Sequence, residues 1–248
     1  MRLVTTDAIV LRTYNLAESD RIVVCLTRSS GLVRGVAKGA RRMRSRFGAA
    51  LEPFTLVRLA FHEKENRELV NISSADILKS HFDLNLLPEV AEVLAYMGEL
   101  INEFAPPHEA DERLFRMLAA CIEALGAGSQ AAREITRYFE IWLLRLAGFF
   151  PDLRACVGCG VELSDSVPTF VDAELNPYCN ACRRSQANPN MSPQVLKIIR
   201  ATYHLSPVNF AQRHALTDAE DVVLGGLTHR LIARAIERRP RTLLAATR

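Results

Sequence analysis

RIVVCLTRSSGLVRGVA (residues 21–37) is the stretch that decides the fold of the first third of the chain. Two apolar, β-branched runs flank a Ser-Ser-Gly turn signal, a pattern typical of neighbouring strands. Similar β-rich runs lie at 8–11, 54–61 and 69–72, separated by turn or polar residues. Five short strands in about 80 residues predict a small closed or nearly closed barrel, for which the OB-fold is the commonest solution. An SH3-like barrel also fits the strand count.

The hydrophobic pattern changes to a helical period after residue 80. Apolar residues at helical spacing predict helices over 90–104, 114–125 and 135–146. The middle of the chain is therefore expected to be a helical bundle.

Helix-start signals return after a stretch, 152–190, that lacks this period. Ser192-Pro193 has the form of an N-cap followed by proline at the first helical position. A capping box from Thr217 to Glu220 predicts a helix that runs to about Arg239. We predict an α+β protein with an OB-fold domain at 1–80 and a helical domain at 81–248, which contains a four-cysteine zinc ribbon at about 153–188.

The composition is that of a folded protein, with 49% apolar and 24% charged residues. The net charge of +3 hides a segregation: residues 1–80 carry +6, residues 81–155 carry −6 and residues 156–248 carry +3. No apolar run approaches the roughly 20 residues that span a bilayer, and the first residues lack a signal-peptide pattern. We therefore expect a cytoplasmic protein without membrane contact, in which thiols stay reduced. Cys25 and Cys121, inside apolar patterns, are expected to be small core residues.

A basic run, VAKGARRMRSRF, follows the quoted stretch and contains no acidic residue. Taken alone, such a run fits a solvated loop or a localisation signal as well as it fits a binding surface. Its place between two barrel strands, and the predominance of arginine, instead favour a surface that binds nucleic acid through its phosphates without reading sequence. The candidate DNA-binding residues are Arg34, Lys38, Arg41, Arg42, Arg44 and Arg46. The candidate stacking platforms are Tyr14, Phe47, Phe54 and Phe61.

A second basic face is a candidate extension of this surface. The arginines at 230, 234 and 238 are spaced i, i+4, i+8 on the expected last helix, and Arg239 follows them. An ordinary exposed helix end, with cations near its C-terminus, explains the same residues equally well.

Four cysteines form two CxxC pairs, Cys156 with Cys159 and Cys179 with Cys182. Two such pairs separated by about 15–20 residues match the thiolate site of a zinc ribbon. A redox-active pair is the competing interpretation, but two pairs at this spacing favour a metal over thioredoxin-like chemistry. With four protein ligands the site is closed to water, so we expect one structural Zn²⁺ per chain.

No set of residues predicts catalysis. The sequence has no Walker motif, no Ser/His/Asp set that can be singled out, and no H-x-E motif beside the cysteines. We therefore expect a protein that is not an enzyme.

The chain resembles the bacterial RecO recombination mediators. The resemblance rests on AIVLRTYNLAESDRIVVCLT, on VAKGAR followed by a basic, serine-containing stretch and LEPF, and on RYFEIWLLRLAGFFPDLRACVGCG. It covers nearly the whole chain.

The resemblance implies an N-terminal OB-fold, a helical domain, and a zinc site that many members share. It also implies binding to single- and double-stranded DNA, annealing of complementary strands, and partnership with RecR in loading RecA onto DNA coated by single-strand binding protein (SSB). The acidic C-terminal tail of SSB is expected to dock on the helical domain. Residues that offer apolar and cationic groups for that tail are Arg133, Arg137, Trp142 and Leu143.

Two other functions fit the residues themselves. An RNA-binding factor would use the same barrel and ribbon. A protein-interaction scaffold would direct the basic run at an acidic partner.

Overall fold

The computed structural model describes residues 2–63, 68–126, 131–163, 169–172, 176–183 and 188–245. The chain forms two compact units, one of Met1–Ala132 with Pro240–Arg248 and one of Arg133–Arg239. The division predicted at residue 80 follows the last barrel strand, and a barrel that folds independently remains a prediction.

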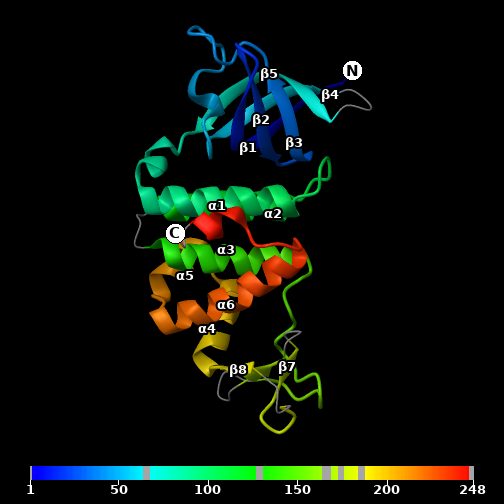
Figure 1. Cartoon of the computed structure of the whole chain (residues 1–248), viewed down its shortest axis with the longest axis vertical. Helices are drawn as coiled ribbons and strands as arrows, with labels where there is room; N and C mark the ends of the chain where they lie inside the picture. The colour runs from blue at the N-terminus through cyan, green and yellow to red at the C-terminus, as the bar shows by residue number, and fades with distance from the viewer. Residues whose placement is uncertain are drawn as a thin grey trace. The chain divides into compact units, whose positions relative to one another are not determined.

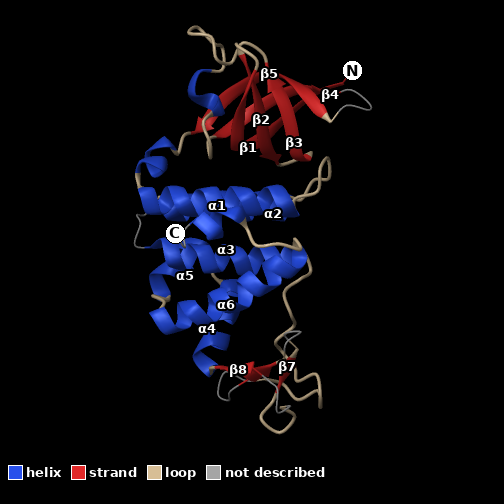
Figure 2. Cartoon of the chain, in the orientation of Figure 1, coloured by secondary structure: helices blue, strands red, loops and turns tan. Residues whose placement is uncertain are grey.

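Five strands close into a barrel in the order β1-β2-β3-β5-β4 (Figures 1 and 2). They are β1 (Arg2–Leu16), β2 (Asp20–Thr27), β3 (Gly31–Ala37), β4 (Leu56–Glu63) and β5 (Leu69–Lys79). Only β3 and β5 pair in parallel, and the other neighbouring strands are antiparallel. The five-stranded Greek-key barrel confirms the predicted OB-fold.

Every second side chain of the strands points into the barrel and fills its core. In β4 the side chains of Val57, Leu59 and Phe61 are fully buried, whereas Arg58 between them is exposed. Inward apolar side chains from all five strands meet in one core, so a one-residue slip of any strand would turn its polar side chains inward.

The first strand is much longer than the 8–11 run that predicted it. Its first half pairs with β4 and its second half with β2, with a bulge between Val10 and Arg12. The polar ends of β1 pair through the backbone at the barrel rim, so they carry no apolar signal that sequence inspection could detect.

Three helices belong to the first unit. They are α1 (Pro88–Phe104), α2 (Glu112–Leu125) and the short α7 (Arg241–Ala245), and the 3-10 turns η1 (Gly48–Leu51) and η2 (Phe82–Leu86) lie between β3 and β4 and before α1. Glu99 of α1 accepts hydrogen bonds from the backbone N–H groups of Arg241 and Thr242. This carboxylate satisfies free amides at the start of α7 and binds residues 241 and 242 to the first unit.

The described residues of the second unit form four helices and a small sheet. The helices are α3 (Ala132–Leu146), α4 (Pro193–His204), α5 (Pro207–Arg213) and α6 (Asp218–Ala235), and the sheet strands are β6 (Thr169–Val171), β7 (Pro177–Tyr178) and β8 (Asn188–Met191). Ser192 caps α4, and the capping box from Thr217 to Glu220 opens α6, as predicted. No helix of the described residues is long and apolar enough to cross a membrane.

The last predicted helix was wrong in length. Helix α6 ends at Ala235, four residues before Arg239. Glu237 adopts a left-handed backbone with φ of 55°, which cannot continue a right-handed helix. Arg238 and Arg239 therefore do not share a helical face with Arg230.

Candidate nucleic-acid interface and metal centre

The basic connection, residues 38–47, is fastened to the turn between β1 and β2. The Gly39 N–H donates to Asp20 Oδ1 at 2.8 Å. The Arg41 backbone N–H donates to the Ser19 carbonyl at 2.9 Å, and its guanidinium donates to the Ala17 carbonyl at 2.9 Å. This segment is therefore a built part of the barrel rim, unlike a solvated tail.

Asp20 is the anchor of this arrangement. The Gly39 N–H and the Ser19 hydroxyl, with smaller contributions from Lys38 and Arg42, hold the pKa of Asp20 below its ordinary value. Gly39 has φ of +71°, in the left-handed region that glycine adopts without strain. An ionised Asp20 thus fixes the start of the connection, and the arginines that follow Gly39 stay exposed to solvent.

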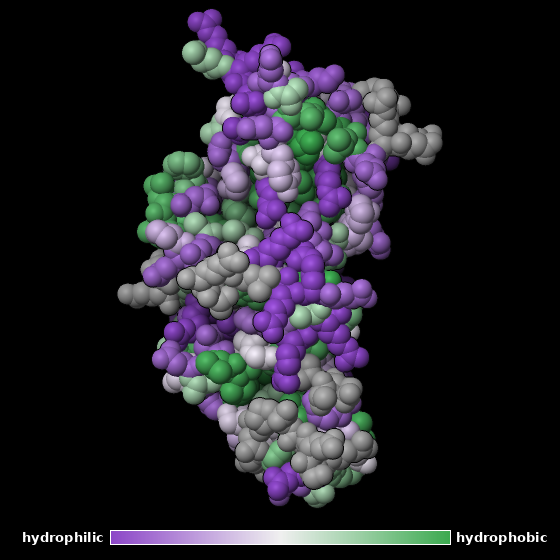
Figure 3. Space-filling model, in the orientation of Figure 1, coloured by the Kyte–Doolittle hydropathy of each residue, from purple (hydrophilic) through white to green (hydrophobic). Residues whose placement is uncertain are grey.

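Four cations of the connection project into solvent. Lys38, Arg42, Arg44 and Arg46 are exposed, and within the described part of the chain none has an acidic side chain at ion-pair distance. The guanidinium of Arg46 lies 4.9 Å from the centre of the Phe47 ring, whose side chain is in the barrel core. The connection leaves the end of the barrel at the top of Figure 1, and Figure 3 shows mostly hydrophilic residues there.

The two other predicted DNA-binding arginines are partly engaged. Arg41 bonds the Ala17 carbonyl, and Arg34 is exposed but donates to Asn102 Oδ1 at 3.1 Å. The structure thus separates arginines that shape the surface from those that are available to a ligand.

Three of the four predicted stacking platforms are core residues. Phe47, Phe54 and Phe61 are 3%, 4% and 0% exposed, because Phe47 and Phe61 lie in the barrel core and the Phe54 ring packs against Gly98 of α1. Tyr14, which is 48% exposed, is the one of the four that a base could reach.

A pocket on the barrel was missed by sequence reasoning. Val36, Asn71 and His62 are direct neighbours across β3, β5 and β4. With Ile72, Ser73, Lys38 and Arg46 they line a cavity of about 230 Å³, called the barrel pocket below. The alternation of Val70 and Ile72 inward with Asn71 and Ser73 outward was the available signal.

The four cysteines come together as predicted. Cys156, Cys159, Cys179 and Cys182 each bring one sulfur, and the sulfurs all lie within 4.8 Å of one another. The sulfurs of Cys159 and Cys179 are 3.8 Å apart. A tetrahedron with metal–sulfur bonds of about 2.3 Å has edges of about 3.8 Å, so the donor set fits one metal ion.

The first CxxC pair is folded around backbone hydrogen bonds. The Gly160 N–H donates to the Cys156 carbonyl at 2.8 Å, and Gly160 has φ of +73°. Burial opposes ionisation of Cys156, but N–H groups of Cys179, Cys159 and Gly158 together hold its pKa at about 6. A Cβ at Gly158 would lie 3.0 Å from the Cβ of Cys182, so the two pairs approach too closely for a larger residue.

The predicted insert at 153–188 is described in part. Residues 164–168, 173–175 and 184–187 lie outside the described residues. The rest includes β6 and β7, and β8 begins at its end, in a three-stranded sheet of order β7-β6-β8.

Arginines of the second predicted basic face are divided between two elements. Arg230 and Arg234 are exposed on α6, and the guanidinium of Arg230 bonds the Gly226 carbonyl at 2.9 Å. Arg238 and Arg239 follow the end of the helix, so the predicted continuous face at i, i+4, i+8 is wrong.

The residues chosen for tail docking on α3 are mostly structural. Arg137 bonds Asp221 at 2.7 Å and Glu140 at 2.5 Å, and Glu140 also accepts from Thr228. Leu143 is 1% exposed. Arg133 is exposed but pairs with Asp218 at 2.8 Å, and the Trp142 N–H bonds the Thr202 carbonyl at 2.8 Å.

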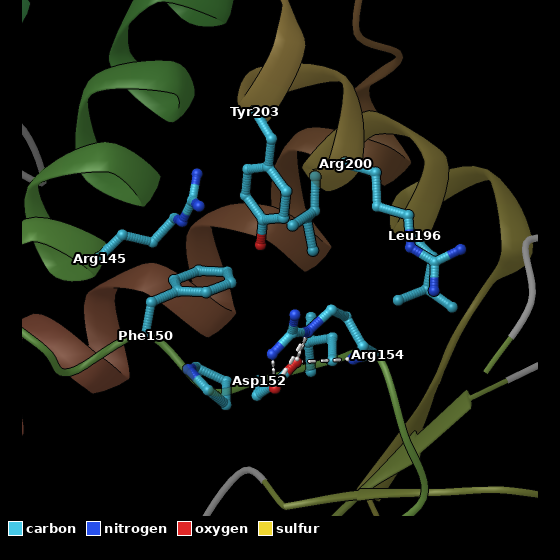
Figure 4. Close-up of a pocket in the computed structure, with 10 residues that line it drawn as sticks. Arg145, Phe150, Asp152, Arg154, Leu196, Arg200 and Tyr203 are labelled. Carbon is cyan, nitrogen blue, oxygen red and sulfur yellow. Dashed lines mark hydrogen bonds and ion pairs between the residues drawn. The ribbon is translucent and has the colours of Figure 1, made fainter. Parts of the chain in front are cut away.

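A second pocket, of about 380 Å³, opens beside α3 and α4 and is called the helical pocket below (Figure 4). Its lining combines apolar side chains and three arginines, namely Phe150, Pro151, Leu153, Leu196 and Ile199 with Arg145, Arg154 and Arg200, beside Asp152 and Tyr203. The Arg145 guanidinium stacks 3.6 Å from the centre of the Tyr203 ring, and its Nη1 is buried without an acceptor among the described residues. Asp152 pairs with Arg154 and so compensates one of the three cations.

Comparisons with known proteins cover both parts of the chain. The family model described as Recombination protein O N terminal matches residues 1–81, and the one described as Recombination protein O C terminal matches residues 91–244. A protein of Koribacter versatilis named DNA repair protein RecO is 41% identical over 160 residues, 64% of this chain and 65% of that protein. Proteins of the same name from Anaeromyxobacter sp. (strain K) and Geobacter metallireducens are each 35% identical, over 73% and 76% of this chain and 71% and 76% of their own lengths.

Proposed function

We propose that this chain, which belongs to the RecO family of DNA repair and recombination proteins, binds single- and double-stranded DNA without sequence specificity and anneals complementary strands. In this proposal it acts without catalysis, in the cytoplasm. Membership in the family places the chain in DNA repair and recombination; the binding mode and the annealing step are the proposal.

One observation carries the proposal: the exposed cations of the basic connection, which is fastened to the rim of an OB-fold and has no ion pair on Lys38, Arg42, Arg44 or Arg46 among the described residues. Phosphate binding releases counterions, and each neutralised phosphate adds to an affinity that falls with salt. Lys38, Arg42, Arg44 and Arg46 offer this neutralisation without first having to break an ion pair with another described residue. Arginine also forms paired hydrogen bonds to phosphate oxygens.

Contacts to the phosphates of one strand would also favour its annealing to a second strand. A strand held by its backbone keeps base edges open to a second strand, and neutralised charge lowers the repulsion between the two strands. The barrel would therefore bring complementary strands together without distinguishing their sequences.

The test is the triple variant Arg42→Ala, Arg44→Ala and Arg46→Ala, which keeps the Arg41 contacts that hold the connection. We expect weaker binding to every DNA sequence, with a plot of log K against log salt that is flatter by about 0.7 per lost phosphate contact on single strands and about 0.9 on duplex. Annealing of complementary strands coated with SSB should slow in parallel.

A matched control removes three exposed arginines elsewhere: Arg113→Ala and Arg116→Ala on α2 with Arg213→Ala on α5. This control changes net charge equally and should leave the salt slope intact. An unchanged affinity and slope in the first variant would overturn the proposed interface.

The structural metal is proposed to be Zn²⁺. Four sulfurs at tetrahedral separations, with N–H groups directed at Cys156, support this choice. Elemental analysis of the purified protein should give one zinc per chain, and its absence would overturn the choice.

The proposed partners besides DNA are RecR, the C-terminal tail of SSB and, indirectly, RecA. The tail offers acids and a terminal Phe, and so requires apolar contacts next to a cation. The helical pocket offers both, and it adjoins Trp142 of the predicted set, since Arg145 lies over the Trp142 ring at 4.7 Å. Because Arg137 and Leu143 are engaged inside the unit, this pocket supports the docking proposal better than they do.

A fluorescent tail peptide tests this docking. Binding should weaken about tenfold or more in Arg145→Ala, because a charge-assisted hydrogen bond contributes about 1.5–3 kcal/mol. Arg133→Ala, on the same helix, serves as the control. Tail binding that is equal in both variants would remove the helical pocket from consideration.

Competition between RNA and DNA of one sequence distinguishes an RNA-binding factor from the proposed function. An absence of DNA binding at about 50 mM salt would favour a scaffold with an acidic partner.

A further inference from the structure

The barrel pocket differs from the basic connection in the kind of group it presents. Connection residues offer charge alone, whereas the pocket floor offers the carboxamide of Asn71, the hydroxyl of Ser73 and the imidazole of His62. Asn71 and His62 are half-buried and stand opposite each other on β5 and β4. The pocket is thus assembled by strand register, which makes its shape part of the barrel.

These three polar side chains have no hydrogen-bond partner in the described parts of the chain. Other side chains of the same kinds are engaged: Asn102 accepts from Arg34, and Asn176 bonds Asp172. Half-buried donors and acceptors that the fold leaves unused are suited to a ligand with a polar edge.

The other lining residues offer what a nucleotide needs besides polar contacts, namely an apolar contact for its base and cations for its phosphate. Val36, which is half-buried, gives an apolar contact for the face of a base. Lys38 and Arg46 belong to both the pocket and the basic connection, so a phosphate they hold lies next to the polar floor. A carboxamide can donate and accept at once, as base edges require.

We propose that the barrel pocket takes one unpaired nucleobase, with its phosphate on Lys38 and Arg46, and so gives the protein a preference for single strands. The inference rests on the proposed DNA binding and adds a base-holding site to it. In a duplex, the Watson–Crick edge is occupied by the opposite base and is not available to a pocket. Duplex DNA therefore contacts only the outer cations.

This site has a consequence for annealing. When a second strand pairs with the held base, the base must leave the pocket, so the product is bound less tightly than the reactant strand. Release of the duplex then needs no separate energy source.

The experiment uses the full-length protein with Asn71→Ala combined with Ser73→Ala, neither of which changes charge. Affinity for a single-stranded oligonucleotide should fall about 5- to 150-fold, the factor that corresponds to one good bidentate contact with a base edge. Affinity for the matching duplex should stay within about twofold of wild type, and both salt slopes should be unchanged.

The matched control is Thr5→Ala with Asn85→Ala, two polar residues of the same unit outside the pocket. Asn71→Leu provides a second test variant that keeps side-chain size while removing the hydrogen bonds. A thermal melt of each variant identifies any loss of folding.

A second measurement reports the site directly. A photoreactive thio-substituted base in a single strand should cross-link to β5, and cross-linking should disappear when the complementary strand is added. An oligonucleotide with abasic positions, which keeps every phosphate, should bind the wild-type protein more weakly than the intact strand.

Equal losses for single strand and duplex in the pocket variant, or equal binding of abasic and intact strands, would overturn the pocket. If wild-type protein binds no DNA, the proposed function itself is wrong. The two failures are therefore distinct.

Discussion

The arginines of the basic connection and those of α3 are the same residue type in opposite states. Arg42 and Arg44 stand in solvent with no acid at ion-pair distance in the described chain. Arg137 is held by Asp221 and by Glu140, whose side chain is fully buried. One set is available to a ligand, and the other neutralises charge inside the fold.

Segment charge anticipates this difference. Residues 1–80 have 14 basic and 8 acidic side chains, whereas residues 81–155 have 6 and 12. In the acidic segment Arg137 and Arg154 have acidic partners, whereas Arg113 and Arg116 stay exposed. Segment charge therefore indicates where exposed cations gather, but the partners of each arginine have to be read from the fold.

The largest expected effect concerns the four cysteines, whose negative charge the proposed metal would neutralise. Removing the proposed zinc with a strong chelator, or replacing Cys159 and Cys182 by serine, should unfold the cysteine insert, because structural zinc contributes about 10–16 kcal/mol of binding free energy in small zinc domains. Hydrogen exchange should rise in residues 154–163 and 176–183 and stay unchanged in β1–β5. Accelerated exchange in the barrel would break the comparison.

Arg137→Met should destabilise the helical unit by about 3–5 kcal/mol, because it leaves the buried carboxylate of Glu140 without its cation. Urea unfolding measures the loss. The double variant with Glu140→Leu should recover most of it, since both charges are then absent. DNA affinity should not change; a loss of DNA binding in folded Arg137→Met would show that the two sets of arginines share a task.

Acid should lower the free energy of unfolding of the second unit between about pH 4.5 and pH 2. Burial alone would raise the pKa of Glu140, but Arg137, His229 and Thr228 together hold it at about 2, below the ordinary 4.5. Its contribution to stability is therefore complete above pH 4.5 and is lost as the pH falls toward about 2, amounting to about 3 kcal/mol at most. Urea unfolding at a series of pH values checks this, and Glu140→Gln should be less stable at pH 7 but lack that part of the pH dependence.

The smallest expected effect is on stability when the exposed arginines of the basic connection are removed. Arg42→Ala, Arg44→Ala and Arg46→Ala should change the free energy of unfolding by no more than about 0.5 kcal/mol, because these exposed side chains have no acidic partner at ion-pair distance among the described residues. Thermal unfolding measures this alongside the DNA assay. A large destabilisation would mean that the connection depends on them and that weakened DNA binding has a structural cause.

Local signals made much of the fold predictable. Turn residues, period-2 runs and capping boxes lie within a few residues of the structure they specify, and so do the CxxC pairs. The ends of β1 and α6 were not predictable, because backbone pairing at a barrel rim and a left-handed Glu237 leave no apolar pattern. Each needs the rest of the fold as context.

The candidate site was predictable only in outline. The basic run was evident, but Asp20 binds Gly39 from 19 residues away and Arg137 meets Asp221 from 84 residues away. Which arginine is engaged and which is exposed depends on such distant pairs. For the same reason the burial of Phe47 in the barrel core and of Phe54 against α1 could not be predicted from their place beside a basic run.

The carboxylate of Glu99, which receives the first amides of α7, makes the first unit discontinuous along the chain. On a ribosome, residues 240–245 emerge only after the whole second unit has been synthesised. The first unit therefore cannot be completed until every residue between its two parts has been synthesised.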